Sequence, residues 1–397
     1  MSLHPVNLMN SDLKAWQRTA IRNTMASYRH AQDNYYVGGK PLVELDDGYK
    51  AFSLLTPPLG SPAARRRVKL IMENMLRSNG AAAGAGRTPH VITMAVTYNC
   101  QCECLHCSAA DYQEKTRREN SALTFEELKS TIDQTLDLGT TCVVLTGGEP
   151  LLYERIYDLV AAVDKHRSVC TIFTNGEFLL EHTVARLKQA GVYGVFVSLD
   201  HFDPERHNTH RQRPGLAEKA YRGLRLCQDA GILTGVSTYA TKENIGNGEL
   251  DAMMDLARSL DVLEVFLFDV IPTGRLSAQH ECMLSDEDAR HIVEFRAKYT
   301  AKPDYPRIIH QTMFSSIAYP CVAEGCPAGM VQVHLRANGD VCPCDFTPYS
   351  FGNIRKQPLK EIWGSMTAHA LYAEPSARCR LSQPGFWVKL AELAPEC

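Results

Sequence analysis

Four cysteines lie within one eight-residue segment of this chain, CQCECLHC, at positions 100, 102, 104 and 107. Thiols at this density are typical of a disulfide framework, a zinc site or an iron–sulfur cluster. Cys100, Cys104 and Cys107 have the spacing C-x3-C-x2-C, which can supply three thiolates to a four-iron cluster and leave the fourth iron open to an outside ligand. A structural zinc site commonly uses two C-x2-C pairs, and this segment contains only one. The segment therefore favours an iron–sulfur cluster.

The elements that must position these thiols begin at residue 91, where apolar β-branched runs alternate with helical periods. This pattern predicts a parallel sheet covered by helices. Six β/α units in a row favour a partial, TIM-like (β/α)6 barrel over a doubly wound sheet. Strands are expected at 91–97, 142–147, 169–175, 194–200, 235–241 and 262–270, and helices at 124–138, 153–166, 179–190, 217–230, 249–260 and 285–299. Sites in such folds gather where strands end, and the cysteine segment directly follows the first strand.

Two flanking regions complete the predicted α/β architecture around a barrel at 91–300. Residues 1–90 are expected to form an N-terminal extension with helices at 11–33 and 63–80 and a linker at 81–86. We interpret the three arginines of the second helix as a solvated basic face. Residues 301–397 are rich in Pro, Gly and Cys, and they predict a small domain held by metal rather than by a large core.

The bulk composition is that of a globular protein. A formal net charge of −3 gives no reason to expect nucleic acid, and membrane association is not expected. The N-terminus lacks a signal-peptide pattern and no run of 18 apolar residues occurs, which predicts a cytoplasmic location. In such a compartment the 14 cysteines more often bind metal or do chemistry than pair as disulfides. Four that occur singly fit small buried apolar side chains: Cys142, Cys170, Cys227 and Cys282.

The segment AVTYNCQCECLHCSA, followed by GGEP at 147–150, resembles the radical SAM superfamily. The resemblance implies a [4Fe–4S] cluster on Cys100, Cys104 and Cys107, with S-adenosylmethionine on the open iron. It also implies reductive cleavage to a 5′-deoxyadenosyl radical, which abstracts a hydrogen atom from the substrate. The electron would come from a reducing protein such as flavodoxin or ferredoxin. Cys102 has no counterpart in the family pattern, and we interpret it as a spare thiol.

Polar motifs follow further predicted strands, where the family contacts S-adenosylmethionine. Each tripeptide alone would be an ordinary turn, but several at successive strand ends form a specific combination. By resemblance, the expected cofactor-binding residues are Gly147, Gly148, Glu149, Pro150, Asn175, Ser198 and Asp200. The loop 201–215 carries three histidines and three arginines, and His207 and Arg211 match an H-x3-R pattern. These cations are expected either to face an acidic substrate or the methionine carboxylate, or to be solvated.

The segment GCPAGMVQVHLRANGDVCPCDF has the spacing C-x12-G-x4-C and resembles the start of a SPASM or twitch extension. It predicts a hairpin that turns at Asn338-Gly339. The resemblance implies one auxiliary cluster, because the further cysteine run of full SPASM domains is absent from the sequence. Four cysteines here also fit a structural zinc site. The expected ligands are Cys321, Cys326, Cys344 and Cys379, with Cys342 and Cys397 as alternates for the fourth.

The function that the resemblance favours is modification of a peptide or protein side chain. One alternative is a radical SAM enzyme that acts on a sugar, a lipid or another small metabolite, including a lipid at a membrane surface reached through the 63–80 helix. Another is a non-enzymatic iron–sulfur or zinc protein, against which the open three-cysteine site and GGEP argue. No catalytic acid or base can be named from the sequence, and neither can the oligomeric state.

Overall fold

The computed structural model describes residues 40–78, 87–312 and 325–393, and its framework is a ten-stranded sheet in the order β12-β11-β10-β3-β4-β5-β6-β7-β8-β9. Strand β10 and strands β3 to β9 run parallel, whereas β11 and β12 are antiparallel to their neighbours. The six central strands are Val91–Thr97 (β3), Cys142–Gly147 (β4), Val169–Thr174 (β5), Gly194–Ser198 (β6), Leu233–Ala240 (β7) and Glu264–Asp269 (β8). The predicted α/β sheet of parallel strands is confirmed.

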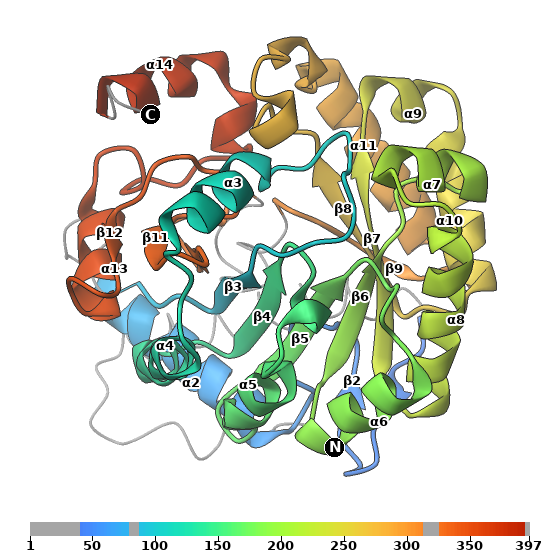
Figure 1. The fold of residues 1–397 in the computed structure, drawn as a ribbon, viewed down its shortest axis with the longest axis horizontal. Coiled ribbons are helices and arrows are strands. Elements are labelled where there is room, and N and C mark those ends of the chain that lie inside the picture. Colours follow the sequence, from blue (N-terminus) through green and yellow to red (C-terminus); the bar gives the residue numbers. More distant parts are fainter. Residues whose placement is uncertain (1–39, 79–86, 313–324, 394–397) are drawn as a thin grey trace.

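Helices connect these strands around the outside of the sheet (Figure 1). They are Phe125–Leu138 (α4), Ile156–Ala162 (α5), Glu181–Ala190 (α6), Leu216–Asp229 (α8), Glu249–Ser259 (α10) and Asp286–Thr300 (α11), with Lys242–Gly246 (α9) as a shorter turn. One prediction is wrong, because the segment 201–215 is not a loop but contains the helix Pro204–Arg211 (α7). Asp203 accepts hydrogen bonds from the amides of Glu205 and Arg206, and Pro204 occupies the first helical position, so the start of α7 is well specified.

The C-terminal segment extends the barrel sheet at both edges. Arg307–His310 (β9) pairs with β8, and Gln332–Leu335 (β10) pairs with β3 on the other side. β10 forms the predicted hairpin with Asp340–Cys342 (β11), and Gly352–Asn353 (β12) follows. Gly339 has a φ of +93° in the turn, a conformation that favours glycine.

Residues 325–393 have more apolar core than the sequence predicts. The helix Leu359–Ala368 (α13) buries four apolar side chains in the same core as α4: Leu359, Ile362, Trp363 and Met366. Tyr372 and Leu381, with Phe386 of the helix Pro384–Leu393 (α14), form a further buried cluster with Cys326. Burial of these side chains therefore contributes to the stability of this segment in addition to the metal that the sequence predicts.

A segment from the N-terminal extension closes one end of the barrel. Leu54 and Leu55 pack against inward-facing residues of the strands, including Val144 and Phe266. The buried carboxylate of Glu264 accepts hydrogen bonds from Ser53 Oγ at 3.1 Å and from the Leu54 amide at 3.0 Å. Because β8 supplies Glu264, this contact fixes the segment under the barrel, and the opposite end of the strands remains open. The short strands Val43–Glu44 (β1) and Lys50–Ala51 (β2) precede it.

The helix Pro62–Ser78 (α2) packs on the barrel with its arginines only partly in solvent. Arg66 Nη1 donates to the carbonyls of Thr140 at 2.8 Å and Arg167 at 3.2 Å, and Arg67 is 1% exposed. The prediction of a solvated basic face is therefore wrong for these two arginines. Among the described residues, no helix is long and apolar enough to cross a membrane. The helix expected at 11–33 and the linker at 81–86 lie outside the described residues.

Candidate active site

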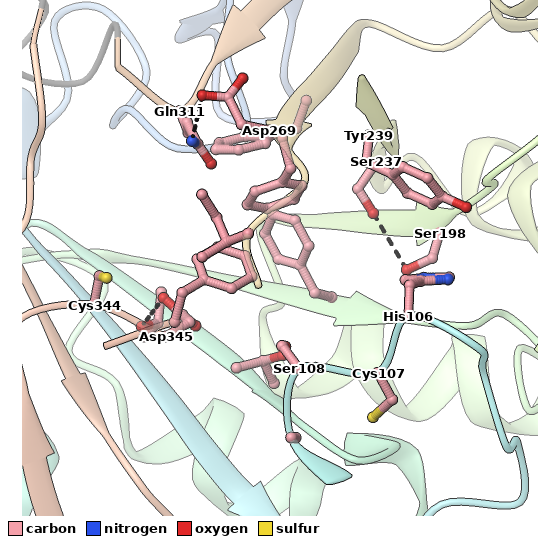
Figure 2. Close-up of a pocket in the computed structure, with 18 of the residues that line it drawn as sticks. His106, Cys107, Ser108, Ser198, Ser237, Tyr239, Asp269, Gln311, Cys344 and Asp345 are labelled. Atoms are coloured by element: carbon pink, nitrogen blue, oxygen red, sulfur yellow. Dashed lines mark hydrogen bonds between the residues drawn. The ribbon is translucent and has the colours of Figure 1, made fainter. Parts of the chain in front are cut away.

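A cavity of about 320 Å³ opens where the parallel strands end, and both groups of cysteines line it. Cys100, Cys102, Cys104 and Cys107 belong to the loop after β3, while Cys326, Cys344 and Cys379 come from the C-terminal segment. Figure 2 shows Cys107 and Cys344 at separate places on the wall of this cavity. The two cysteine groups, far apart in the sequence, therefore share one space.

The cysteine loop is fixed mainly through its backbone. Its Leu105 amide donates to the carbonyl of His210 at the end of α7, at 2.9 Å. Arg275 donates its amide to the Cys107 carbonyl at 3.0 Å and Nη1 to the Cys104 carbonyl at 2.7 Å. These contacts leave the thiols free to face the cavity. Arg275 belongs to the segment IPTGR at 271–275, which follows β8.

Cys102 is not remote from the other thiols. It hydrogen-bonds to the side chains of both Cys100 and Cys104, and it lines the cavity with them. The hydrogen bond from Cys102 has the largest effect on Cys104 and lowers its pKa. Burial opposes this shift and the charge of Arg211 adds to it, so the pKa of Cys104 falls to about 6. Cys104 therefore favours the thiolate form, which is the form that binds iron.

Two glycine motifs give the loop room to approach. A Cβ on Gly148 would lie 2.5 Å from the Asn99 carbonyl oxygen and 2.7 Å from that of Tyr98. Gly274, whose φ is +55°, lies against the other end of the loop, and a Cβ there would be 2.2 Å from the Cys107 carbonyl oxygen. Gly148 of GGEP and Gly274 of IPTGR thus allow the backbone to contact the cysteine segment closely on two sides.

Glu149, one of the expected cofactor-binding residues, is buried beside residues of the cavity wall. Its side chain is fully buried and accepts hydrogen bonds from Thr174 Oγ1 at 2.7 Å, the Asn175 amide at 2.9 Å and the Leu151 amide at 3.0 Å. Burial raises the pKa of Glu149 to about 7, although these hydrogen bonds act in the opposite direction. Neither Glu149 nor Pro150 lines the cavity. In the structure Glu149 ties the end of β4 to the end of β5.

The remaining expected cofactor-binding residues do line the cavity: Gly147, Gly148, Asn175, Ser198 and Asp200. Asn175 is 4% exposed, and its Nδ2 has no hydrogen-bond partner in the described structure. A buried amide nitrogen without a partner is costly, so this donor suits a ligand in the cavity. Ser198 Oγ accepts from Ser237 Oγ at 3.2 Å.

Asp200 anchors the cations that follow β6. It accepts two hydrogen bonds from Arg211, Nε at 2.5 Å and Nη2 at 2.7 Å, and His106 Nε2 lies 3.6 Å away. Burial alone would raise the pKa of Asp200, but Arg211 and then His106 hold it well below its usual range. His207 is fully buried and accepts from the Asp200 amide at 3.1 Å.

Each arginine of 201–215 has a carboxylate partner in the structure. Arg211 pairs with Asp200, Arg213 with Glu177 at 2.8 Å, and Arg206 with Glu249. The expectation of a solvated side chain is wrong for Arg211, which is buried against Asp200, whereas Arg206 and Arg213 are half-exposed and pair with their carboxylates.

Two carboxylates that sequence reasoning missed also line the cavity. Asp269, at the end of β8, accepts from Gln311 Nε2 at 2.8 Å and lies 2.7 Å from His310 Nε2. Asp345 accepts from Thr93 Oγ1 at 2.9 Å and Gln332 Nε2 at 3.0 Å, and it lies 3.3 Å from His334 Nδ1. A signal for each was present, since Asp269 ends a predicted strand as Asp200 does, and Asp345 directly follows Cys344.

On the C-terminal side, three of the expected ligands face the cavity together. The thiols of Cys326 and Cys379 hydrogen-bond to each other, and Cys344 Sγ lies 3.1 Å from Thr347 Oγ1. Cys342 is fully buried in β11 and does not line the cavity, whereas Cys321 and Cys397 lie outside the described residues. Among the described residues, no group of three or more His, Cys, Asp or Glu side chains is arranged to hold a single metal ion.

The residues present fit the cofactors that the sequence implies. Three thiols with cluster spacing and a partnerless amide share one cavity, and three further thiols line it from the C-terminal side. A bound [4Fe–4S] cluster supplies the electron that cleaves S-adenosylmethionine reductively. The protein's own residues position the thiols through Arg275, Gly148 and Gly274, and shape the walls through the Glu149 and Asp200 contacts.

Comparison with known proteins agrees with this arrangement. Residues 94–257 match the radical SAM superfamily, and residues 326–382 match an iron–sulfur cluster-binding domain, SPASM. An AdoMet-dependent heme synthase from Methanosarcina barkeri is 28% identical over 293 residues, which cover 69% of this chain and 82% of that protein. The antilisterial bacteriocin subtilosin biosynthesis protein AlbA from Bacillus subtilis is 24% identical over 301 residues, covering 72% of this chain and 62% of that protein.

A solved structure shows the likeness of fold. SuiB from Streptococcus suis, bound to the precursor peptide SuiA, superposes with a TM-score of 0.58 at 18% identity, over 76% of this chain and 69% of SuiB. The chain belongs to the radical SAM superfamily, as an enzyme with a C-terminal SPASM domain. Its cofactors are therefore a [4Fe–4S] cluster that binds S-adenosylmethionine and an iron–sulfur cluster of the SPASM domain.

Proposed function

We propose that this enzyme abstracts a hydrogen atom from a peptide or protein side chain that enters the cavity between the two cysteine groups. Cys100, Cys104 and Cys107 ligate the cluster that binds S-adenosylmethionine. Cys321, Cys326 and Cys344, with Cys379 as the fourth ligand, hold the auxiliary cluster. The cavity-lining members of the expected set contact S-adenosylmethionine: Gly147, Gly148, Asn175, Ser198 and Asp200. Glu149 and Pro150 keep the backbone of that contact in place.

The size of the cavity supports a side chain as the reacting group. Small-molecule sites commonly have volumes of roughly 300 to 1,000 Å³, and this cavity, at about 320 Å³, is near the lower limit. S-adenosylmethionine must share that space with the substrate. A peptide or protein can present one side chain to this space while its backbone stays outside, which a large rigid molecule cannot do.

The sequence relatives favour a second candidate, a small metabolite of the tetrapyrrole class. Besides the heme synthase, an Fe-coproporphyrin III synthase from Methanosarcina barkeri is 25% identical over 329 residues, covering 73% of this chain and 80% of that protein. Incubation with S-adenosylmethionine, reductant and either peptides or Fe-coproporphyrin III separates the two candidates. The substrate is the one that raises 5′-deoxyadenosine above the uncoupled level and changes in mass.

The ligand assignment is tested by iron content after anaerobic reconstitution. Two four-iron clusters predict about eight irons per chain, and the combined variant Cys100→Ala, Cys104→Ala, Cys107→Ala should keep about half. It should also lose reductive cleavage of S-adenosylmethionine. Cys282→Ala, at a half-buried thiol outside the cavity, is the matched control and should keep both. A triple variant that retains all its iron would refute the assignment, as would a wild-type protein that binds only zinc.

Cys102→Ala provides a second control inside the loop. The spare-thiol interpretation predicts full iron content, although Cys102 contacts two proposed ligands. Loss of a whole cluster in this variant would show that Cys102, rather than one of its neighbours, is a ligand.

A further inference from the structure

The wall of the cavity between the two cysteine groups combines negative charge with aromatic rings. Phe268 and Asp269 are adjacent at the end of β8, and Asp345 and Phe346 are adjacent after β11. The rings of Phe268 and Phe346 lie edge to face, with centroids 5.9 Å apart at 72°, so the two pairs adjoin in the cavity wall. We call these four residues the acidic-aromatic subsite.

The two carboxylates keep capacity to accept further hydrogen bonds. A carboxylate has about four lone-pair positions. Asp269 has two described partners, the side chains of Gln311 and His310, and Asp345 has three, those of Thr93, Gln332 and His334. These partners are amides, a hydroxyl and imidazoles, so no described Arg or Lys neutralises either carboxylate.

The rest of the cavity wall offers no unpaired Arg or Lys among the described residues. Among the described residues that line it, Arg211 is the single Arg or Lys, and Asp200 already pairs with it. The proposed thiolate ligands add negative charge on both sides. An anionic group would therefore enter against repulsion, whereas a cation would gain charge-assisted hydrogen bonds and contact with ring faces.

The subsite lies away from the proposed S-adenosylmethionine contacts. Figure 2 places Asp269, Gln311, Cys344 and Asp345 on one side of the pocket and His106, Ser198, Ser237 and Tyr239 on the other. Asp345 directly follows Cys344, a proposed auxiliary-cluster ligand. The subsite is thus positioned for the substrate rather than for the methionine moiety.

We propose that the acidic-aromatic subsite binds a cationic nitrogen group of the substrate, an amine or guanidinium such as the end of a lysine or arginine side chain. This inference rests on the proposed function, because it assigns the substrate class of the same cavity. It also separates the two candidates, since a substrate whose reacting part is anionic would find no unpaired described cation in the cavity wall.

The test is calorimetric titration of the reconstituted enzyme, loaded with S-adenosylmethionine, with matched probes. N-acetyl-lysine-N-methylamide carries the cation, its norleucine analogue is neutral with nearly the same shape, and the glutamate analogue is anionic. We expect the lysine probe to bind at least about tenfold more tightly than the norleucine probe, and the glutamate probe to bind most weakly. Pentylamine distinguishes the source of the cation, because binding equal to that of the lysine probe indicates a free amine rather than a peptide.

Three variants connect the preference to the subsite. Asp269→Asn and Asp345→Asn should each reduce the lysine-to-norleucine preference about tenfold, while Asp133→Asn, an exposed carboxylate on α4, should keep it. Equal binding of the neutral or anionic probe by the wild type overturns the inference. So does a lysine probe that fails to bind at about 10 mM, or a preference that survives in both subsite variants. The wild-type comparison stands even if a variant fails to fold.

Uncoupled cleavage of S-adenosylmethionine by the same preparation reports the radical activity separately. An enzyme that cleaves the cofactor but shows no preference for a cation has lost only this inference. One that does not cleave it, and does not bind iron through the proposed cysteines, contradicts the proposed function itself.

Discussion

The pair of Asp200 and Arg211 offers a quantitative test of how the end of β6 is built. The side chains are 2% and 13% exposed, so Arg211→Met would leave a carboxylate buried without its main partner. Removing one partner of a buried ion pair costs about 3 to 5 kcal/mol. With about 2.1 cal/mol/K of unfolding entropy per residue and 397 residues, a loss of this size lowers Tm by about 5 °C if the chain unfolds in one transition.

The pH dependence of this loss identifies its cause. In the wild type, Arg211 and His106 hold the pKa of Asp200 well below its usual range against the effect of burial, so Asp200 is ionised at both pH 5 and pH 8. Without Arg211, burial raises the pKa of Asp200 above its unfolded value. The folded variant then takes up a proton as the pH falls, and the difference in Tm from the wild type should be smaller at pH 5 than at pH 8.

The assay is anaerobic thermal unfolding of the reconstituted enzyme at both pH values. The double variant Asp200→Asn, Arg211→Met should recover part of the lost stability, because no buried charge remains. Arg206→Met, on the same helix but half-exposed, is the matched control and should shift Tm by about 1 °C or less. A deficit that is independent of pH, or a double variant as unstable as the sum of the single variants, would refute the reasoning.

Two further predictions concern the cysteine loop and the buried histidine behind it. Gly148→Ala should lower iron content and Tm, because its Cβ would meet the Asn99 carbonyl at 2.5 Å. Gly364→Ala on α13 has open space around its Cβ and should be neutral or slightly stabilising. Iron analysis and thermal melts measure both effects. Burial lowers the pKa of His207 to about 4 despite the charge of Asp200. Between pH 7 and pH 5 this histidine therefore takes up a proton mainly in the unfolded state, which should lower the free energy of unfolding by about 2 kcal/mol. The Tm of His207→Gln should therefore fall less between pH 7 and pH 5 than that of the wild type. An equal fall in both proteins would contradict the low pKa of His207.

Much of the barrel could be predicted because its signals are local. Strands β3 and β4 have the bounds that the apolar runs indicate, and the hairpin turns at Asn338-Gly339, since side-chain period and turn chemistry operate over a few residues. Helix α7 escaped prediction because its polar sequence has no apolar period, although Asp203-Pro204 marked its start. Strand β9 was missed because four residues are too few for a periodic pattern.

By itself the sequence determined the chemistry that the chain can hold: the spacing of Cys100, Cys104 and Cys107, the glycines beside them and the second cysteine group. Only the tertiary structure decided which of these residues meet. Thr93 and Asp345, 252 positions apart, share a hydrogen bond, and Glu149 accepts a hydrogen bond from the backbone at the end of the neighbouring strand. Contacts of this kind depend on how distant segments pack and on which buried polar groups need a partner, and no short stretch of sequence contains that information.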